Sequence, residues 1–366
     1  MVEPCQTTMQ RCRLNPLITP GDIVPSFPEW EVLGAFNAGV AQINDEIILL
    51  LRVAESPRQM DPNHLLVPVL DTDVCDGGKG TRMKTVKLER NDPNLDFSDP
   101  RVVRDRDGRT LYLTSISHLR VARSRDGERF TIEESPSIMP EGRAECWGIE
   151  DPRITFLDNH YYITYSAVSD KGVGVGLLST RDFVRFQREG LILAPTNKDA
   201  VIFPERIEGR YYMLHRPVPE GIGAPEMWLA ASSDLKHWGD HQFLMGLRDG
   251  LWDDQRIGAG CVPIKTDDGW LVLYHGADRA NRYCMGAALL DLRQPGRVIA
   301  RLKEPVLFPE APYEISGFFN QVVFACGAVV RDNRVTMYYG VCDESMASVT
   351  FELQPLINRL KDQSDQ

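Results

Sequence analysis

The chain has 366 residues, of which 43% are hydrophobic and 25% are charged, and its formal net charge is −11. These proportions are ordinary for a globular protein, and the length fits one large domain or two smaller ones. The acidic balance argues against nucleic acid as a partner. The longest apolar run, Ile47–Leu51, is far too short to cross a bilayer.

The first residues lack the apolar core of a signal peptide. The eight cysteines are spread without CxxC spacing, and several fall in expected strands, where a free thiol behaves as a small hydrophobic group. We therefore expect a reduced, cytoplasmic protein with no membrane association, no disulfide framework and no metal site.

In chain order, residues 1–30 contain five prolines and are expected to form an irregular lead-in. Alternating, aromatic-rich strands separated by Gly, Asp and Asn turns then fill residues 31–354, which predicts a single all-β domain. In the remaining tail, 355–366, only Leu356–Lys361 has a helical pattern. The clearest early strands are Gly39–Ile43, Ile47–Val53, Leu65–Leu70, Lys84–Leu88, Val102–Arg104, Leu111–Ser115, Leu119–Ser124 and Phe130–Glu134.

A turn-and-strand phrase recurs along this domain, each time followed by a polar turn and an aromatic strand. Repeats of about 50 residues that each hold several short strands are typical of a β-propeller. Such a fold gathers the first strand of every repeat around one axis, so polar residues at equivalent positions converge on one pocket. Six cycles can be counted, and the phrases begin at Phe36, Asp99, Asp151, Phe203, Val262 and Val323.

Charged residues cluster at these phrases and at the ends of two aromatic strands. Each has a structural explanation when it is taken singly, because Asp and Pro are common in turns and a strand arginine or histidine often has a structural partner. A scaffold alone would not require a different charge from each repeat, however, so we expect a polar pocket. The residues concerned are Glu150, Asp151, Arg153, Lys198, Asp199, Glu205, Arg216, Arg256 and His275.

The motifs together resemble glycoside hydrolase family 130 over about residues 15–350. They include Gly148–Ile154, Asn197–Ala200, Phe203–Glu205, Leu214–Pro217, Arg256–Gly260, Leu273–Gly276, Gly286–Asp291 and Tyr338–Gly340. The resemblance implies a mannoside phosphorylase, or one of the family's mannosidases, on a five-bladed β-propeller with four-stranded blades and an active site on the central axis. The similarity is greatest to the branch that acts on β-1,2-mannobiose and β-1,2-oligomannan.

The resemblance also implies a role for each matching position. Asp151 matches the general acid; the phosphate contacts match Lys198, Arg216, His275 and Tyr283; and the sugar contacts match Asn37, Arg52, Arg58, Arg256 and Asp343. The stretch 60–148, longer than in shorter members, holds a second Asp-Pro-Arg turn at Asp99 and is either an insertion in the first blade or an extra blade. Trp147, Phe318 and Phe319 are equally compatible with stacking on sugar and with core packing.

The physical chemistry of these residue types favours phosphorolysis. An inverting hydrolase needs a second carboxylate to activate water, whereas phosphate is already an anion and needs cations to hold it. Repulsion by Glu150 would raise the pKa of Asp151, and a nearby arginine would oppose it. The expected enzyme is an inverting phosphorylase that converts a β-mannoside and inorganic phosphate, its co-substrate, into α-mannose 1-phosphate without a cofactor. A phosphate-independent β-mannosidase and a noncatalytic sugar-binding propeller are the alternatives, the linkage stays open between β-1,2 and β-1,4, and a homo-oligomer is compatible with the sequence.

Overall fold

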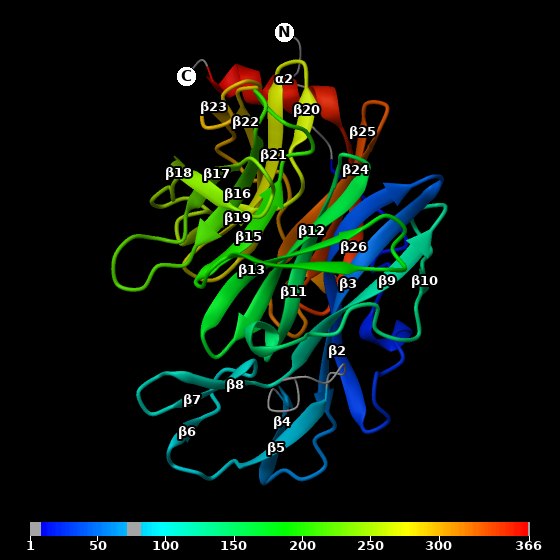
Figure 1. Ribbon diagram of the computed structural model, residues 1–366, viewed down its shortest axis with the longest axis vertical. Helices are drawn as coiled ribbons and strands as arrows, with labels where there is room; N and C mark the ends of the chain where they lie inside the picture. Colours follow the sequence, from blue (N-terminus) through cyan, green and yellow to red (C-terminus); the bar gives the residue numbers. More distant parts are fainter. Residues whose placement is uncertain (1–8, 72–81, 365–366) are drawn as a thin grey trace.

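The computed structural model describes residues 9–71 and 82–364, and its architecture is all-β (Figure 1). The largest sheet has eight strands in the order β14-β13-β12-β11-β9-β3-β2, with β10 paired to β9. Its strands are β2 (Trp30–Ile43), β3 (Glu46–Pro57), β9 (Ile116–Ser124), β10 (Thr131–Ile132), β11 (Gly148–Leu157), β12 (His160–Ser169), β13 (Gly172–Thr180) and β14 (Gln187–Leu193). A single parallel bridge, Gly148 to Ser117, joins β11 to β9, so the sheet consists of two antiparallel groups of four strands.

Three further antiparallel sheets follow in chain order. The first runs β15-β16-β17-β18, the second β19-β21-β22-β23 with β20 paired to β21, and the third β1-β26-β25-β24. Their strands are β15 (Asn197–Ile202), β16 (Tyr211–Pro217), β17 (Met227–Ser232), β18 (Trp238–Met245), β19 (Arg256–Ala259), β20 (Ile264–Thr266), β21 (Gly269–Ala277), β22 (Tyr283–Leu290), β23 (Val298–Arg301), β24 (Val323–Arg331), β25 (Arg334–Val341), β26 (Ser345–Glu352) and β1 (Gln10–Arg11). The third sheet therefore combines the last strands of the chain with its first.

Part of the stretch 60–148 forms two small sheets at one end of the molecule, at the bottom of Figure 1. One pairs β4 with β5 and the other has the order β6-β7-β8. They surround a small core of Leu65, Val67 and Val103. Their strands are β4 (His64–Leu70), β5 (Met83–Glu89), β6 (Leu95–Asp96), β7 (Val102–Asp105) and β8 (Thr110–Leu113). The second of the six sequence cycles is therefore divided between two sheets. Its strands β7 and β8 lie in a small sheet, whereas β9 and β10 belong to the eight-stranded sheet.

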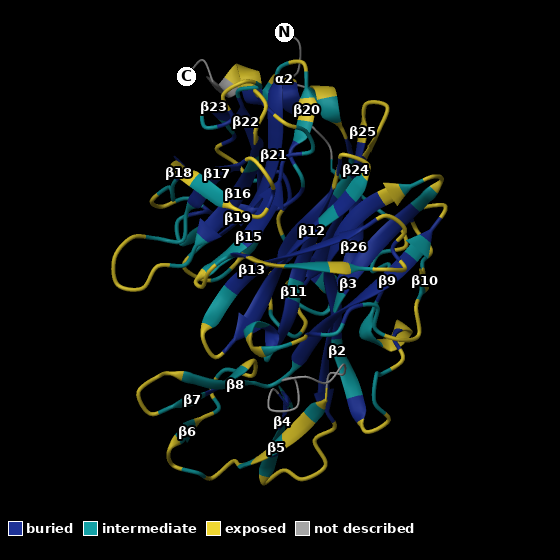
Figure 2. Cartoon of the chain, in the orientation of Figure 1, coloured by how far each residue is buried: buried dark blue, intermediate teal, exposed yellow. Residues whose placement is uncertain are grey.

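The main core lies between adjacent sheets, and Figure 2 shows the buried central strands against the more exposed β4–β8 region. Aromatic side chains fill the space between sheets; Phe203 and Trp270, for example, meet edge to face with ring centroids 5.2 Å apart. The C-terminal tail is part of this core. Its helix α2 (Leu353–Ser364) is longer than predicted and packs Leu356 and Leu360, both fully buried, against the sheets. A second helix, α1 (Pro312–Ile315), was not predicted.

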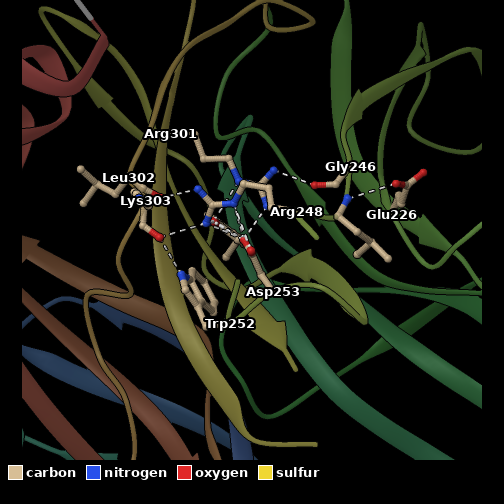
Figure 3. A network of polar contacts seen from close by, with 10 residues as sticks. Glu226, Gly246, Arg248, Trp252, Asp253, Arg301, Leu302 and Lys303 are labelled. Atoms are coloured by element: carbon tan, nitrogen blue, oxygen red, sulfur yellow. Dashed lines mark hydrogen bonds and ion pairs between the residues drawn. The ribbon is translucent and has the colours of Figure 1, made fainter. Parts of the chain in front are cut away.

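A buried ion cluster fixes the segment that leads into β19 (Figure 3). The carboxylate of Asp253 is fully buried and accepts hydrogen bonds from Arg248 Nη2 at 2.7 Å and from Arg301 Nη2 at 2.6 Å. The indole of Trp252 donates to the Lys303 carbonyl at 2.9 Å. Because β19 begins at Arg256, this cluster fixes the entry of a strand that carries a cavity residue.

The six cysteines within the described residues are free, while Cys5 and Cys75 lie outside that part of the chain. No helix within residues 9–71 and 82–364 has the length and apolar character needed to span a membrane.

Candidate active site

A cavity of about 300 Å³ opens where strands from several sheets meet. Nine of the ten predicted site residues line it: Asn37, Arg52, Asp151, Lys198, Arg216, Arg256, His275, Tyr283 and Asp343. Arg58 is the exception, because it lies exposed just beyond the end of β3. The sheets bring together side chains that are as much as 306 residues apart in the chain, the separation between Asn37 and Asp343.

At three polar residues, a positive φ and an irregularity in strand pairing direct the side chain toward the cavity. Asn37, Asp151 and Asp199 have φ values of 47°, 49° and 55°, and each lies at an irregularity in strand pairing, on β2, β11 and β15 respectively. Positive φ is uncommon outside glycine, but Asn and Asp tolerate it best, and a bulge redirects the side chain. The three residues occupy equivalent places in successive repeats, which explains why the sequence pattern located them.

Asp151 is buried, and its carboxylate is hydrogen-bonded to the amide of Asn37 and to the guanidinium of Arg52. Its Oδ1 accepts from Asn37 Nδ2 at 3.0 Å and from Arg52 Nη1 at 3.0 Å, while Arg52 Nη2 donates to Glu150 at 2.8 Å. Burial acts to raise the pKa of Asp151, but Arg52, Lys198 and Arg153 outweigh it and hold the pKa below its ordinary value. Of the two opposing effects expected from the sequence, the cations prevail over repulsion by Glu150.

The opposite side of the cavity is rich in cations. Lys198 and Arg216 are register partners on β15 and β16. Arg256 donates to the Tyr283 hydroxyl at 2.9 Å and to Asn281 Oδ1 at 3.0 Å. Within the residues that the structure describes, neither Lys198 nor Arg256 has a carboxylate partner at ion-pair distance. Two positive charges therefore face the cavity without neutralisation, which favours an anionic ligand.

Asp343 lies at the β25–β26 turn and is the second carboxylate close to Asp151. Burial raises its pKa to about 6; Arg52 and Arg101 oppose this, and Asp151 and Glu150 add to it. The folded protein therefore holds a proton on Asp343 more tightly than the unfolded chain does. As the pH rises from about 4 to about 6, the contribution of Asp343 to the free energy of unfolding falls.

Asp343→Asn should remove this penalty. At about pH 7.5 the free energy of unfolding should increase by up to about 3 kcal/mol, and at about pH 4 the gain should almost disappear. Urea denaturation at both pH values measures the difference. Asp332→Asn is the matched control, because Asp332 has a similar backbone conformation, φ 47° against 53°, but is exposed in the β24–β25 turn. An equal gain at both pH values would contradict the explanation.

Several cavity residues were absent from the predicted site. Arg101, in the second Asp-Pro-Arg turn, comes from the small-sheet region, and its guanidinium lies 4.4 Å from the centroid of the Phe319 ring. Phe318 and Phe319 line the cavity, whereas Trp147 is not among the lining residues. The recurring Asp-Pro-Arg motif was the available signal for Arg101. Glu150 and Asp199, which were expected in the polar pocket, also line the cavity. The remaining lining residues were not predicted: Leu33, Phe36, Ala54, Val102, Leu113, Ser115, Val322 and Phe324.

Comparison with known proteins agrees with this geometry. The profile of glycoside hydrolase family 130, described as beta-1,4-mannooligosaccharide phosphorylase, matches residues 109–362. A beta-1,2-mannobiose phosphorylase from Listeria innocua is 48% identical over 95% of this chain and 97% of its own. A 1,2-beta-oligomannan phosphorylase from Thermoanaerobacter sp. is 40% identical over 66% of this chain and 80% of its own. The chain belongs to glycoside hydrolase family 130.

Solved structures extend the comparison to the fold. The Listeria innocua beta-1,2-mannobiose phosphorylase, in complex with beta-1,2-mannobiose, superposes with a TM-score of 0.93 at 46% identity and covers 97% of this chain and 99% of that one. A glycosyl hydrolase from Bacteroides ovatus has a TM-score of 0.72 at 22% identity, covering 97% and 96%, and shares the fold alone. The family profile begins at residue 109, so most of the small-sheet region lies outside the segment it matches.

Proposed function

We propose that the protein is an inverting phosphorylase that cleaves a β-mannoside with inorganic phosphate and forms α-D-mannose 1-phosphate. The observation that carries the proposal is the presence, within one cavity, of a buried carboxylic acid residue, Asp151, and of a cation, Lys198, that has no carboxylate at ion-pair distance within the described residues. The names of the Listeria and Thermoanaerobacter relatives, both phosphorylases of β-1,2-mannosides, support the reaction class.

In the proposed reaction, a phosphate oxygen attacks the anomeric carbon of mannose from the face opposite the leaving group. The bond from that carbon to the glycosidic oxygen breaks, the configuration inverts from β to α, and the leaving oxygen takes a proton that originates on Asp151, either directly or through a sugar hydroxyl. Lys198, Arg216, His275 and Tyr283 hold the phosphate in this proposal, as charge-assisted contacts favour.

The low pKa of Asp151 in the free protein fits this sequence of events. A bound phosphate dianion would neutralise part of the positive charge that Lys198 now exerts on Asp151. The pKa of the acid would then rise, which favours the protonated form that the leaving oxygen needs. Binding of phosphate would thereby prepare the acid for the leaving oxygen.

The remaining predicted residues are assigned to the sugar. Asn37, Arg52, Arg256 and Asp343 line the cavity and would contact the mannose units on either side of the scissile bond. The same role for Arg58 stays a prediction from the resemblance, because this residue is outside the lining set. The names of the relatives favour β-1,2-mannobiose or β-1,2-oligomannan as the substrate, and the description of the family profile supplies β-1,4 as the alternative.

We further propose that the five groups of strands, four of them four-stranded and one with β20 as a fifth strand, form a five-bladed propeller, which makes residues 31–354 one catalytic domain. Two groups come from the halves of the large sheet and three from the remaining sheets, and the cavity collects residues from strands of all of them. In this arrangement β4–β8 is an insertion in the first blade rather than a blade of its own. Free thiols at the described cysteines fit a cytoplasmic setting.

The decisive assay incubates the purified protein with β-1,2- or β-1,4-mannobiose, each with and without phosphate, and identifies the products by NMR. We expect α-mannose 1-phosphate and one equivalent of mannose from the β-1,2 substrate, and only when phosphate is present. Two equivalents of free mannose in phosphate-free buffer would establish a hydrolase. Binding without any product would establish a sugar-binding protein.

A further inference from the structure

A buried carboxylate lies at the centre of the cation cluster. Asp199 is 2% exposed, and its Oδ2 accepts a hydrogen bond from Arg216 Nε at 2.7 Å and lies 3.3 Å from His275 Nε2. Its Oδ1 accepts from Arg153 Nη2 at 3.2 Å. Two of the proposed phosphate contacts, Arg216 and His275, thus share one carboxylate oxygen.

A negative charge at this place repels an incoming phosphate, so it requires a compensating role. Pairing with Arg153 neutralises a second buried charge but does not account for the contacts with Arg216 and His275. Arg153 also donates to three backbone carbonyl groups, those of Asp151, Ala259 and Gly260, at 2.9 to 3.1 Å, so its guanidinium is hydrogen-bonded without the carboxylate. Arg216, by contrast, has Asp199 as its only ion-pair partner among the residues that the structure describes.

The neighbouring strand β19 leaves room for the contact between Asp199 and the imidazole of His275. Gly258 on β19 is the register partner of His275, and a Cβ atom there would lie 2.5 Å from Asp199 Oδ2 and 2.6 Å from His275 Cε1. A separation below 3.0 Å forces one of these groups to move. The strand therefore leaves space for the carboxylate and the ring to meet.

Asp199 engages Arg216 through Nε, on the inner edge of the guanidinium. The two terminal nitrogens of Arg216, which form the fork suited to bidentate contact with an oxyanion, have no hydrogen-bond partner within the described residues. The carboxylate thus fixes the plane of the guanidinium while leaving its binding edge available. His275 is held against the same oxygen, which fixes the orientation of its ring.

We propose that Asp199 is a positioning residue for phosphate: it orients Arg216 and His275 so that they bind the co-substrate, without touching the reacting atoms itself. The inference rests on the proposed phosphorolysis and adds to it a residue that acts only on the phosphate side of the reaction. Within the part of the chain that the structure describes, neither Asn37 nor Arg52, on the mannoside side, forms a hydrogen bond or ion pair with this carboxylate.

The isosteric variant Asp199→Asn tests the proposal through steady-state kinetics with each substrate varied. The apparent KM for phosphate should rise on the order of 10-fold, a part of the effect of losing one charge-assisted contact, while the KM for the mannoside changes by less than about twofold. In an Arg216→Ala background, Asp199→Asn should raise the KM for phosphate by a smaller factor than in the wild type, because only its effect through His275 remains. Additive effects, or equal changes in both KM values, would overturn the positioning role.

Gly258→Ala is the second variant, and it keeps every charge. Its added methyl group displaces the carboxylate and the ring from their contact, so it should also raise the KM for phosphate selectively. This variant keeps the proposal testable if Asp199→Asn does not fold. A Gly258→Ala protein with both KM values unchanged would contradict the proposal.

Glu55→Gln is the matched structural control. Glu55 is a buried carboxylate that also contacts a histidine and an arginine, His118 at 3.0 Å and Arg120 at 3.4 Å, but it does not line the cavity. We expect a lower Tm with an unchanged ratio of the two KM values. The wild-type assay without phosphate separates the two hypotheses: phosphate-independent cleavage rejects the proposed function, whereas phosphate-dependent cleavage with a normal KM in Asp199→Asn rejects the positioning role alone.

Discussion

Asp151→Asn should fold normally and lose about 10²- to 10⁴-fold in turnover, the range expected for a general acid. An amide cannot supply the proton that the leaving oxygen needs. Folding should be preserved because asparagine tolerates the positive φ of 49° at this position, and because Arg52 keeps Glu150 as an ion-pair partner at 2.8 Å. The measurements are kcat with saturating phosphate and mannoside, together with Tm.

The second Asp-Pro-Arg turn provides the control for this substitution. Asp99 pairs with Arg101 and Arg104 in the small-sheet region and is not among the residues that line the cavity. Asp99→Asn should therefore retain a large part of the activity. An inactive Asp99→Asn beside a near-normal Asp151→Asn would mean that the general acid had been assigned to the wrong turn.

Arg216→Ala should raise the apparent KM for phosphate by about 10- to 150-fold, with a much smaller change in the KM for the mannoside. The substitution removes a charge-assisted contact worth roughly 1.5–3 kcal/mol from one substrate only. Asp199 stays paired with Arg153 at 3.2 Å, so the buried carboxylate is not left without a cation. Initial rates over a matrix of both substrate concentrations separate the two constants.

Arg248→Ala is the corresponding control. Arg248, like Arg216, pairs with a buried aspartate, Asp253 (Figure 3), but neither Arg248 nor Asp253 lines the cavity. Its loss should reduce Tm and leave the phosphate dependence in place. If both arginine variants weaken phosphate binding equally, the effect of Arg216 is a general consequence of destabilisation.

A site residue could be predicted from the sequence where that residue stands at a recurring position of the repeat. Asp151 and Lys198 could be located because both stand at the entry turns of repeats, and Arg216 and His275 because each ends an aromatic strand, so the repeat pattern predicts convergence. Arg101 could not be located in this way. Its place in the cavity depends on how β4–β8 folds back over the first strands, and no local periodicity encodes that path.

The all-β fold class could be predicted from the sequence, but the sheet to which each strand belongs could not. Strands such as Leu119–Ser124 were recognised from their residues, yet the sheet that each joins depends on partners distant in sequence. β9 pairs with β3 in the register Ile47 to Ser124, a separation that spans the whole small-sheet region. A cycle count treats β7, β8, β9 and β10 as one unit, whereas long-range pairing divides them. The lowered pKa of Asp151 was equally beyond reach, because it depends on the balance between burial and three cations.

The pairing of β1 with β26 has a consequence for biosynthesis. Gln10 is the register partner of Thr350 and Arg11 of Val349, and the Cys12 amide donates to the Ser348 carbonyl at 3.0 Å. The last sheet therefore cannot be completed until Gln10 meets Thr350, which is translated 340 residues later. The intervening sheets can form on the ribosome as they emerge, but β1 must stay unpaired until β26 has been made. During that interval the uncovered backbone groups of β1 are free to pair with another chain.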